Sequence, residues 1–511
     1  MKRDDTAAGG KGRPAGFAGF KGFKGKKAKK EKKEIKGRAD GKIMGIAYMV
    51  TAVFIAMAVY FGWFIQFESE NVIGSPYNAR LDRFSDRIVR GRIVSSDGQT
   101  LAETIVAADG TETRGCPFGS LFVHAVGYCG LNGRTGLEAQ ANYYLLSSHV
   151  NLLEKVFREL KGVKSPGDQA VATLDADLQR AAAAALGSHA GAVIAMEPDT
   201  GKILAMVSQP GFDANQVDEM WEALISPDNT SAQLLNRATQ GRYPPGSTFK
   251  ILTALEYMRE NPDTWQDFTF HCTGVFQSGG YAIKCFHSEA HGDQNLIQAF
   301  ANSCNGAFAQ IGLSLDAGRF KSLAESVLFN SPLPYSMPYN ESSFVMDEGA
   351  DEWERLQTAI GQGKTQMTPL HNLLLIAAIA NGGTLMKPYM IDHVENVGGQ
   401  TIRKFLPSAY GSLMSASDAA FLAELLKQAV ENGTGSALKT DRYTAAGKTG
   451  SAEFETGKET HSWFVGYAPA DNPAIAICVI AETAGSGGRV AAPVARAVFD
   501  AYFAKRQGGG G

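Results

Sequence analysis

The longest apolar run in the chain covers residues 43–65, IMGIAYMVTAVFIAMAVYFGWFI, which are 23 residues without a charged side chain. About 20 apolar residues are enough for a helix to cross the hydrocarbon core of a bilayer. A secretory signal has a shorter apolar core of about 7–15 residues and a small-residue cleavage site, which the following QFESEN does not offer. The pattern therefore predicts a membrane-spanning helix, with Trp63 and Phe64 at a membrane–water interface.

Beyond residue 65 the apolar positions follow shorter patterns. Residues 90–103, RGRIVSSDGQTLAE, contain an Asp-Gly turn and predict a short strand-like segment. The helical spacing of NLLEKVFRELK, at 151–161, ends at the proline and glycines of GVKSPGDQ, at 162–169. We therefore predict a juxtamembrane pedestal domain at 66–164 and a larger domain at 165–506.

The larger domain begins with a predicted helix at 175–189 and two apolar runs at 190–197 and 202–210, which the turn PDTG joins into a hairpin. Helical patterns fill most of residues 248–430. Three strands and a closing helix are predicted near the C-terminus, at 443–454, 461–469, 473–483 and 490–506. An antiparallel sheet made from both ends of a domain, with a helical insertion between them, is an α+β arrangement.

Charge is distributed unevenly, although the net charge is only -3. Residues 1–42 contain 15 Lys and Arg against 5 Asp and Glu, so the remainder is acidic. A basic tail can bind nucleic acid, anionic lipid or an acidic partner. Because a membrane helix follows, we interpret it as a cytoplasmic tail attracted to the anionic inner leaflet, with no nucleic-acid partner. Its Gly/Phe/Lys-rich composition predicts disorder, and the glycine-rich residues 507–511 predict a flexible end.

Six cysteines in a chain that lies mostly outside the cytoplasm permit disulfides. Cys116 and Cys129 are 13 positions apart, and so are Cys272 and Cys285. Three histidines lie around the second pair: His271, His287 and His291. Structural zinc sites normally place two cysteines two to four residues apart, so this wider spacing predicts no metal. Whether each cysteine pair is bridged or reduced stays open.

The stretch GRYPPGSTFK places Ser247 three residues before Lys250. Ser-x-x-Lys is weak evidence alone, since Ser436 and Lys439 have the same spacing. Only the first serine follows Pro-Pro-Gly and precedes apolar positions with helical spacing, which predicts a helix that starts at the serine. Residues three apart share a helix face, so the amine of Lys250 can reach the Ser247 oxygen. Ser436 lies instead in a glycine-rich loop.

A serine hydroxyl becomes a good nucleophile when a base takes its proton, and a lysine is such a base only if its pKa is lowered. The hypothesis therefore requires a second cationic group and a polar relay. The chain supplies Ser303 and Asn305 in NSCN, and later the single Lys-Thr-Gly of GKTGS, with Lys448. Ser-x-x-Lys, Ser-x-Asn and Lys-Thr-Gly in this order are the motifs of serine penicillin-recognising enzymes.

In these motifs the chain resembles class B penicillin-binding proteins, which are peptidoglycan D,D-transpeptidases. The resemblance extends from about Arg90 to Arg506 and includes RGRIVSSDGQTLAE, GRTGLEAQANYYL, AMEPDTGKILAMVSQPGFDAN, AIGQGKTQMTPL and HSWFVGYAP. It implies a penicillin-binding/transpeptidase fold with helices on both faces of an antiparallel sheet and a helical subdomain. It also implies that the pedestal is a small dimerisation-like domain.

The resemblance assigns a catalytic role to five residues. Ser247 would attack the carbonyl of the penultimate D-alanine of a stem peptide and form an acyl-enzyme, and Lys250 would take its proton. Ser303 would return that proton to the leaving amine, and Asn305 would hold the peptide backbone. Lys448 would keep Lys250 neutral through like-charge proximity. No cofactor is implied, and β-lactams would acylate the same serine.

The resemblance assigns substrate binding to the third motif. Thr449 and Ser451 would bind the terminal carboxylate, and the backbone amides of Ser247 and Ser451 would form an oxyanion hole. Gly450 would let the substrate approach the strand edge. The family often has threonine where Ser451 stands, but the hydroxyl is kept, and Cys304 in the second motif is interpreted as a small filler.

Other functions could use these motifs. The roughly 100 residues of the pedestal are short for a glycan-polymerising domain and lack an acidic cluster, and no Glu-x-x-Leu-Asn follows Asn305 to support a β-lactamase. A D,D-carboxypeptidase, which transfers to water, stays open, as does a β-lactam sensor. By resemblance, a membrane glycan polymerase of the shape, elongation, division and sporulation family is the expected partner. The catalytic domain is expected outside the cytoplasmic membrane.

Overall fold

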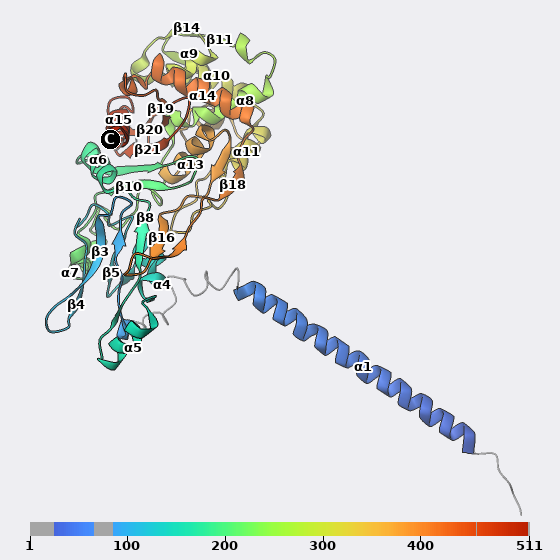
Figure 1. Ribbon diagram of the computed structural model, residues 1–511. Helices are drawn as coiled ribbons and strands as arrows, with labels where there is room; N and C mark the ends of the chain where they lie inside the picture. The colour runs from blue at the N-terminus through green and yellow to red at the C-terminus, as the bar shows by residue number, and fades with distance from the viewer. Residues whose placement is uncertain (1–24, 66–84, 456, 509–511) are drawn as a thin grey trace, which may run out of the picture. The chain divides into compact units, whose positions relative to one another are not determined.

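The computed structural model describes residues 25–65, 85–455 and 457–508, and divides into two units, Met1–Ile73 and Gly74–Gly511 (Figure 1). In the first unit the α-helix α1 covers Gly25–Trp63. Its segment Gly41–Trp63 is 23 residues long, has a mean hydropathy of 2.1 and is not buried. A helix long and apolar enough to cross a membrane is therefore present where the sequence predicts one.

The basic residues before this segment differ in part from the prediction. Disorder was expected throughout 1–42, but α1 begins at Gly25. Lys, Glu and Ala are good helix formers, and extending a helix that already exists avoids the cost of nucleation. The expectation of disorder is therefore wrong for 25–42, and residues 1–24 lie outside the described part of the chain. The predicted flexible end at 507–511 is likewise wrong for residues 507 and 508, which belong to the last helix, and residues 509–511 lie outside the described part of the chain.

The centre of the second unit is a five-stranded antiparallel sheet in the order β10-β9-β21-β20-β19. Its strands are Gly191–Met196, Ile203–Gln209, Ala446–Ala452, His461–Ala468 and Ile475–Ala481, for β9, β10, β19, β20 and β21. The first two come from one end of the domain and the others from the opposite end. The predicted α+β sheet is therefore confirmed.

Helices cover both faces of this sheet, and the strand sequences show why. On β9, Val193 and Ala195 belong to one core cluster and Ile194 to another, because successive side chains point to opposite faces. The helices α6 (Ala176–Leu186) and α15 (Ala491–Gly508) pack on the first face. The apolar helix α13 (Pro369–Ala380) packs on the other, so that the strands lie between α15 and α13 in Figure 1.

The insertion between β10 and β19 is mainly helical, as predicted. Its longer helices are α7 (Val217–Leu224), α8 (Lys250–Glu260), α9 (Leu296–Ala301), α10 (Asn305–Ser314), α11 (Ala317–Ser326), α12 (Glu352–Ala359) and α14 (Ala416–Glu431). The prediction missed eight strands in this insertion, and six of them pair with one another. They pair as β11 (Thr269–Cys272) with β14 (Gly292–Asn295), β12 (Val275–Ser278) with β13 (Tyr281–Lys284), and β15 (Thr384–Met386) with β18 (Ala409–Ser412). Strands of three or four residues are too short to show a period.

A second sheet has the order β17-β16-β8-β2-β3-β4. In that order its strands are Thr401–Lys404, Ile391–Glu395, Gln169–Ala172, Ile93–Val94, Thr100–Val106 and Glu112–Gly115. The sheet therefore joins strands from before and after the predicted boundary at 164/165, inside one compact unit. Composition marks the end of a helix there, whereas long-range strand pairing leaves no local signal.

From residue 85, where the description of this region resumes, to residue 166 there are also one parallel strand pair, one antiparallel strand pair and three α-helices. The pairs are β1 (Ile88–Val89) with β7 (Ser165–Pro166) and β5 (Cys129–Gly130) with β6 (Gly133–Arg134). The helices are α3 (Gly136–Gln140), α4 (Asn142–Leu145) and α5 (Leu152–Leu160).

A buried ion cluster links two of the sequence segments that carry the family resemblance. Glu138 on α3 is fully buried and accepts from Arg90 and Arg114, whose nitrogens lie 2.6 and 2.7 Å from its carboxylate oxygens. Burial alone would raise the pKa of Glu138, but the two guanidinium groups lower it below its ordinary value. The carboxylate therefore neutralises two cations that have almost no access to water.

Replacing Glu138 with glutamine is expected to lower the free energy of unfolding by about 3–5 kcal/mol, because the amide leaves two buried guanidinium groups without a counter-charge. Thermal and denaturant unfolding of the purified chain measure this change. The matched control is Glu154→Gln on α5, which breaks an exposed pair with Arg158 at 2.8 Å and should cost about 0.5 kcal/mol or less. Equal, small effects of both changes would contradict the assigned role of Glu138.

Candidate active site

Ser247 lies in a tight turn directly before α8. The turn is a 3-10 helix, Gly246–Thr248, and the α-helix begins at Lys250. The sequence predicted an α-helix that starts at the serine, and the 3-10 turn replaces its first residues. Gly246 has φ +55°, a backbone conformation that a residue with a side chain adopts only at a cost. The side chain of Ser247 is half-buried, so it is held at an accessible surface.

The turn packs closely against neighbouring backbone. Gly246 donates its N–H to the carbonyl of Gly361 at 2.9 Å, and a Cβ on Gly361 would lie 2.0 Å from the Gly246 oxygen. A Cβ on Gly450 would lie 3.2 Å from the Pro245 oxygen and 3.1 Å from the Trp463 Cβ. The sequence led us to expect that Gly450 lets the substrate approach the strand edge. In the structure, that space is filled by Trp463 and by the turn that carries Ser247.

Lys250 brings the first two motifs together. Its side chain is fully buried, and Nζ donates to the Ser303 carbonyl and to Asn305 Oδ1, each at 2.7 Å. Nζ also lies 3.4 Å from Ser303 Oγ. A neutral amine has two N–H donors and one lone pair, so these two carbonyl acceptors use its donors. The lone pair then remains for a proton from a neighbouring hydroxyl.

Ser303 holds an unusual backbone conformation. Its φ is +56°, in the left-handed region that costs a non-glycine residue about 1–2 kcal/mol. The next residue, Cys304, caps α10 by accepting from the Ala307 N–H, and Asn305 Nδ2 donates to the Lys284 carbonyl at 2.9 Å. These contacts hold the turn that presents Ser303 and Asn305 to Lys250.

Lys448 on β19 is the second buried cation. It is fully buried, donates to the Thr449 carbonyl at 3.2 Å, and lies 5.5 Å from the centre of the Phe300 ring. Burial, and then repulsion from Lys250, lower its pKa well below the ordinary value. Burial likewise lowers the pKa of Lys250 to about 8, although negative charge on Cys304 and Cys285 opposes the shift. Desolvation is therefore the reason that the pKa of Lys250 is lowered, and repulsion between the two lysines adds only to the lowered pKa of Lys448.

The third motif lies on β19 at the end of the sheet, beside the 3-10 turn that carries Ser247. Thr449 Oγ1 and Thr434 Oγ1 are 2.6 Å apart, and Ser451 Oγ accepts from the Gly487 N–H at 3.3 Å. Sequence reasoning did not identify Thr434 or Gly487. Thr434 lies in a glycine-rich loop that contains the duplicate Ser-x-x-Lys, and a hydroxyl in such a loop is indistinguishable from a solvated one before the fold is known.

The duplicate motif does not form a site. Ser436 begins the 3-10 helix Ser436–Leu438, and both Ser436 and Lys439 are exposed. Lys439 lies in solvent, whereas Lys250 is fully buried. His461, the other polar residue near the third motif, packs its ring on Phe454 at 4.1 Å and accepts the Thr483 N–H through Nδ1. These contacts are structural.

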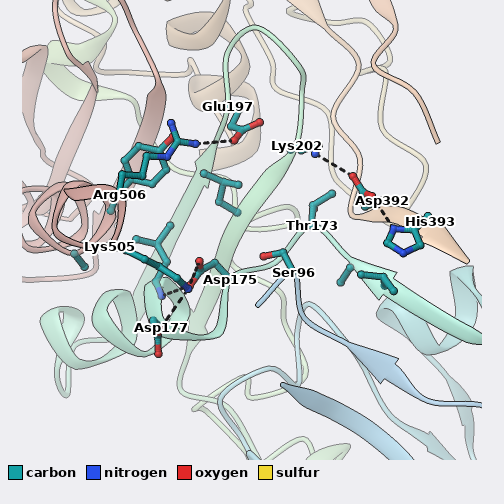
Figure 2. Close-up of a pocket in the computed structure, with 16 residues that line it drawn as sticks. Ser96, Thr173, Asp175, Asp177, Glu197, Lys202, Asp392, His393, Lys505 and Arg506 are labelled. Carbon is teal, nitrogen blue, oxygen red and sulfur yellow. Dashed lines mark hydrogen bonds and ion pairs between the residues drawn. The ribbon is translucent and has the colours of Figure 1, made fainter. Parts of the chain in front are cut away.

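A separate cavity of about 430 Å³ lies among residues of β8, β10, β16, α6 and α15 (Figure 2). Its charged groups already pair with one another: Lys505 with Asp175 at 2.7 Å, Lys202 with Asp392 at 2.9 Å, and Arg506 with Glu197 at 3.2 Å. None of the three motifs contributes to its lining. This cavity is therefore a salt-bridged junction distinct from the candidate active site.

Comparisons with known proteins agree with this geometry. The model of the penicillin-binding protein transpeptidase domain matches residues 191–500. The peptidoglycan D,D-transpeptidase PbpA of Mycolicibacterium smegmatis is 31% identical over 465 residues, which cover 85% of this chain and 93% of that protein. A transpeptidase-domain structure from Eggerthella lenta is 31% identical, with a TM-score of 0.73 over 82% of this chain and 99% of that one. The imipenem acyl-enzyme of penicillin-binding protein A from M. tuberculosis is 29% identical, with a TM-score of 0.73 over 83% and 99%.

The fold and the three converging motifs define a serine acyl-transferase of the penicillin-recognising class. Within that class, the chain belongs to the penicillin-binding protein transpeptidase family, as a class B member with one apolar N-terminal helix. The predicted fold and family are thereby confirmed.

Proposed function

We propose that this protein is a membrane-anchored peptidoglycan D,D-transpeptidase that acts through a Ser247 acyl-enzyme and is a target of β-lactams. The observation that carries the proposal is the environment of Lys250. Its buried amine has a pKa of about 8, donates to Ser303 and Asn305, and lies one helical turn from Ser247. A base with a pKa near the working pH is the most effective proton acceptor.

The first half-reaction transfers the donor peptide to the enzyme. As the Ser247 oxygen bonds to the carbonyl carbon of the penultimate D-alanine, Lys250 takes the hydroxyl proton. The bond to the terminal D-alanine nitrogen then breaks, and Ser303, 3.4 Å from the lysine amine, passes the proton to that nitrogen. Free D-alanine leaves. The N–H groups of Ser247 and Ser451 stabilise the oxyanion, a contribution of about 10²–10³ in rate per donor.

The second half-reaction transfers the acyl group to an amine of a second stem peptide. That amine loses a proton to the same base, attacks the ester carbon and releases the Ser247 hydroxyl. Asn305 binds the donor backbone, and the hydroxyls of Thr449 and Ser451 bind its terminal carboxylate. The outer edge of β19 can accept the donor as an added strand, because β19 is the last strand of its sheet. A β-lactam follows the first half-reaction, and its opened ring stays attached to the serine.

The proposed topology places the N-terminus in the cytoplasm and the unit from Gly74 onward outside the membrane. The excess of Lys and Arg before residue 43 supports this orientation, since positive flanks are retained in the cytoplasm. We also propose a protein partner in the membrane, a glycan polymerase of the shape, elongation, division and sporulation family. Helix α5 supports a protein partner, because Leu153, Phe157 and Leu160 are 79%, 60% and 81% exposed on it.

The reaction is tested with a synthetic stem peptide ending in D-Ala-D-Ala, with and without an amine acceptor, and the full-length chain in detergent. We expect release of D-alanine together with a new amide product whose yield rises with acceptor concentration. Released D-alanine with only the hydrolysed peptide, at every acceptor concentration, would identify a D,D-carboxypeptidase. Penicillin labelling without any D-alanine release would identify a β-lactam sensor.

A further inference from the structure

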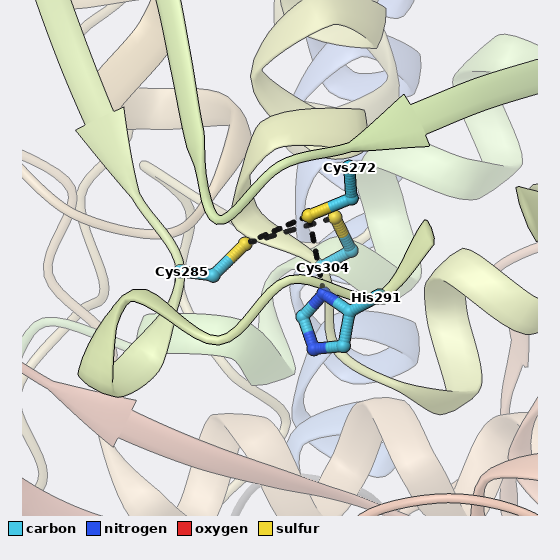
Figure 3. Close-up of side chains that lie close together, drawn as sticks. All are labelled: Cys272, Cys285, His291 and Cys304. Carbon is cyan, nitrogen blue, oxygen red and sulfur yellow. Dashed lines mark hydrogen bonds between the residues drawn. The ribbon is translucent and has the colours of Figure 1, made fainter. Parts of the chain in front are cut away.

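Three thiols and one imidazole converge beside the second motif. They belong to Cys272 at the end of β11, Cys285 after β13, His291 before β14, and Cys304 before α10 (Figure 3). One ligand atom from each of the four lies within 4.8 Å of all the others, and all three cysteines are buried. In Figure 3 the four side chains point into a common space.

The spacing of these atoms fits one tetrahedral metal ion. Zinc binds sulfur at about 2.3 Å and imidazole nitrogen at about 2.0–2.1 Å, so tetrahedral angles place two sulfurs about 3.8 Å apart and a sulfur and a nitrogen about 3.6 Å apart. Cys272 Sγ lies 3.6 Å from Cys285 Sγ, and Cys285 Sγ lies 3.8 Å from Cys304 Sγ. Cys272 Sγ lies 3.3 Å from His291 Nδ1. A disulfide would require a sulfur–sulfur distance of about 2.05 Å and would use only two of the four side chains.

We propose that Cys272, Cys285, His291 and Cys304 bind one Zn²⁺ ion in a closed structural site. Three thiolates and one neutral imidazole are a soft donor set that favours zinc over calcium or magnesium. Binding releases the thiol protons to solvent, and the complex carries one net negative charge. With four protein ligands the ion has no open position, so it takes no part in the acyl transfer.

The segment from Thr269 to Asn295, which carries three of the four ligands, has few other buried residues to hold it in place. Between Thr269 and Asn295 the buried residues besides Cys272 and Cys285 are Gly274, Ile283 and Gln294. A strand pair with so little apolar core has little stability of its own. The metal would connect β11, β13, the loop before β14 and the start of α10 at a single point.

Backbone N–H groups also point at two of the sulfur atoms. The Gly274 N–H donates to Cys272 Sγ at 3.4 Å, and the Ala307 N–H donates to Cys304 Sγ at 3.5 Å. Because these amides belong partly to the first turn of α10, the ion would be anchored to the element that carries Asn305.

The site is one residue from the proposed catalytic groups, which gives it a consequence for the enzyme. Cys304 lies between Ser303, in its left-handed conformation, and Asn305, and both of these neighbours accept from Lys250. A metal on Cys304 would hold the turn in place. Ligand changes should therefore slow acylation as positioning residues do, without removing the nucleophile.

The sequence predicted no metal site, because Cys272 and Cys285 are 13 positions apart and not two to four. Zinc motifs with short spacing are recognised from two cysteines on one turn. Here each ligand comes from a different segment, so the fold alone reveals the cluster. Cys304 was interpreted as a small filler, and this proposal gives it a role instead.

The site is tested on full-length protein in detergent, purified without chelators, by elemental analysis and native mass spectrometry. We expect one zinc per chain in the wild type and less than a tenth of that in Cys272→Ser and Cys285→Ser. Cys129→Ser, a cysteine outside the cluster, is the matched control and should keep the metal. Cobalt substitution of the wild type should give sulfur-to-metal charge-transfer absorption, a readout that does not depend on the stability of a variant.

Two results would overturn the site. One is a metal-free chain in which Cys272 and Cys285 resist alkylation until a reductant is added. That result would show a disulfide between these two cysteines in place of the ion. The other is a fully reduced chain that binds neither zinc nor cobalt. Stripping the zinc should also slow acylation by fluorescent penicillin about tenfold or more, reversibly. An unchanged rate would overturn the positioning role, and a zinc-loaded chain that is never acylated would instead count against the proposed function.

Discussion

Ser247→Ala is expected to abolish covalent labelling of the protein by fluorescent penicillin. In the proposed reaction the Ser247 hydroxyl oxygen forms the ester bond, and alanine has no oxygen at that position. The loss should therefore be complete, and not a reduced rate. The measurement is in-gel fluorescence of the full-length chain after a time course at saturating penicillin, with native mass spectrometry to count the attached acyl groups.

The duplicate motif supplies the control. Ser436→Ala removes an exposed hydroxyl that follows the same spacing rule, and it should label at the wild-type rate. Thermal melting of both variants identifies any loss of folded protein. If folded Ser247→Ala protein is labelled as strongly as the wild type, Ser247 is not the nucleophile.

Lys250→Met should slow acylation by about 10²–10⁴-fold, which is the usual contribution of a general base. Methionine is close to lysine in length and apolar, so it fits a fully buried position, but it cannot accept a proton. In the wild type the neutral fraction of Lys250 rises with pH through its pKa of about 8. The acylation rate should therefore rise about tenfold for each pH unit below that value and level off above it.

The two measurements are stopped-flow acylation of wild type and Lys250→Met between pH 5.5 and 9.5, values chosen to bracket the pKa by roughly two units. The residual rate of the variant should lack the inflection near pH 8. Lys439→Met, at the exposed duplicate, should keep both the rate and the inflection. If the wild-type inflection persists unchanged in Lys250→Met, another group is the base.

The central sheet could be predicted from sequence because its strands are long, apolar and bounded by turn residues. Runs such as AGAVIAME and PAIAICVIAET show their strand character locally. The sharing of one sheet by residues 93–115, 169–172 and 391–404 could not be predicted, since it depends on which strands meet in space. The helix that begins at Gly25 was missed for a different reason: low-complexity composition hid good local helix formers.

The motif residues were recognisable because acyl transfer imposes residue types and an order on the chain. In the structure Lys250 donates to Ser303 and Asn305, so the first two motifs lie together. The physical cause of its lowered pKa was only partly anticipated. Sequence reasoning named Lys448 as the cause, whereas burial is what lowers the pKa of Lys250 in the structure. Burial of a lysine by distant segments has no signature in the residues next to it.

The close packing of Gly246, Gly361 and Gly450 around Ser247 has a consequence for selection by antibiotics. A methyl group at Gly361 would collide with backbone, so it could not be accommodated by rotating a side chain. A substitution that weakened β-lactam binding by reshaping the turn around Ser247 would therefore also disrupt the active site. Escape should instead accumulate at the exposed rim, where Thr434 borders the third motif and a change of side chain leaves the turn intact.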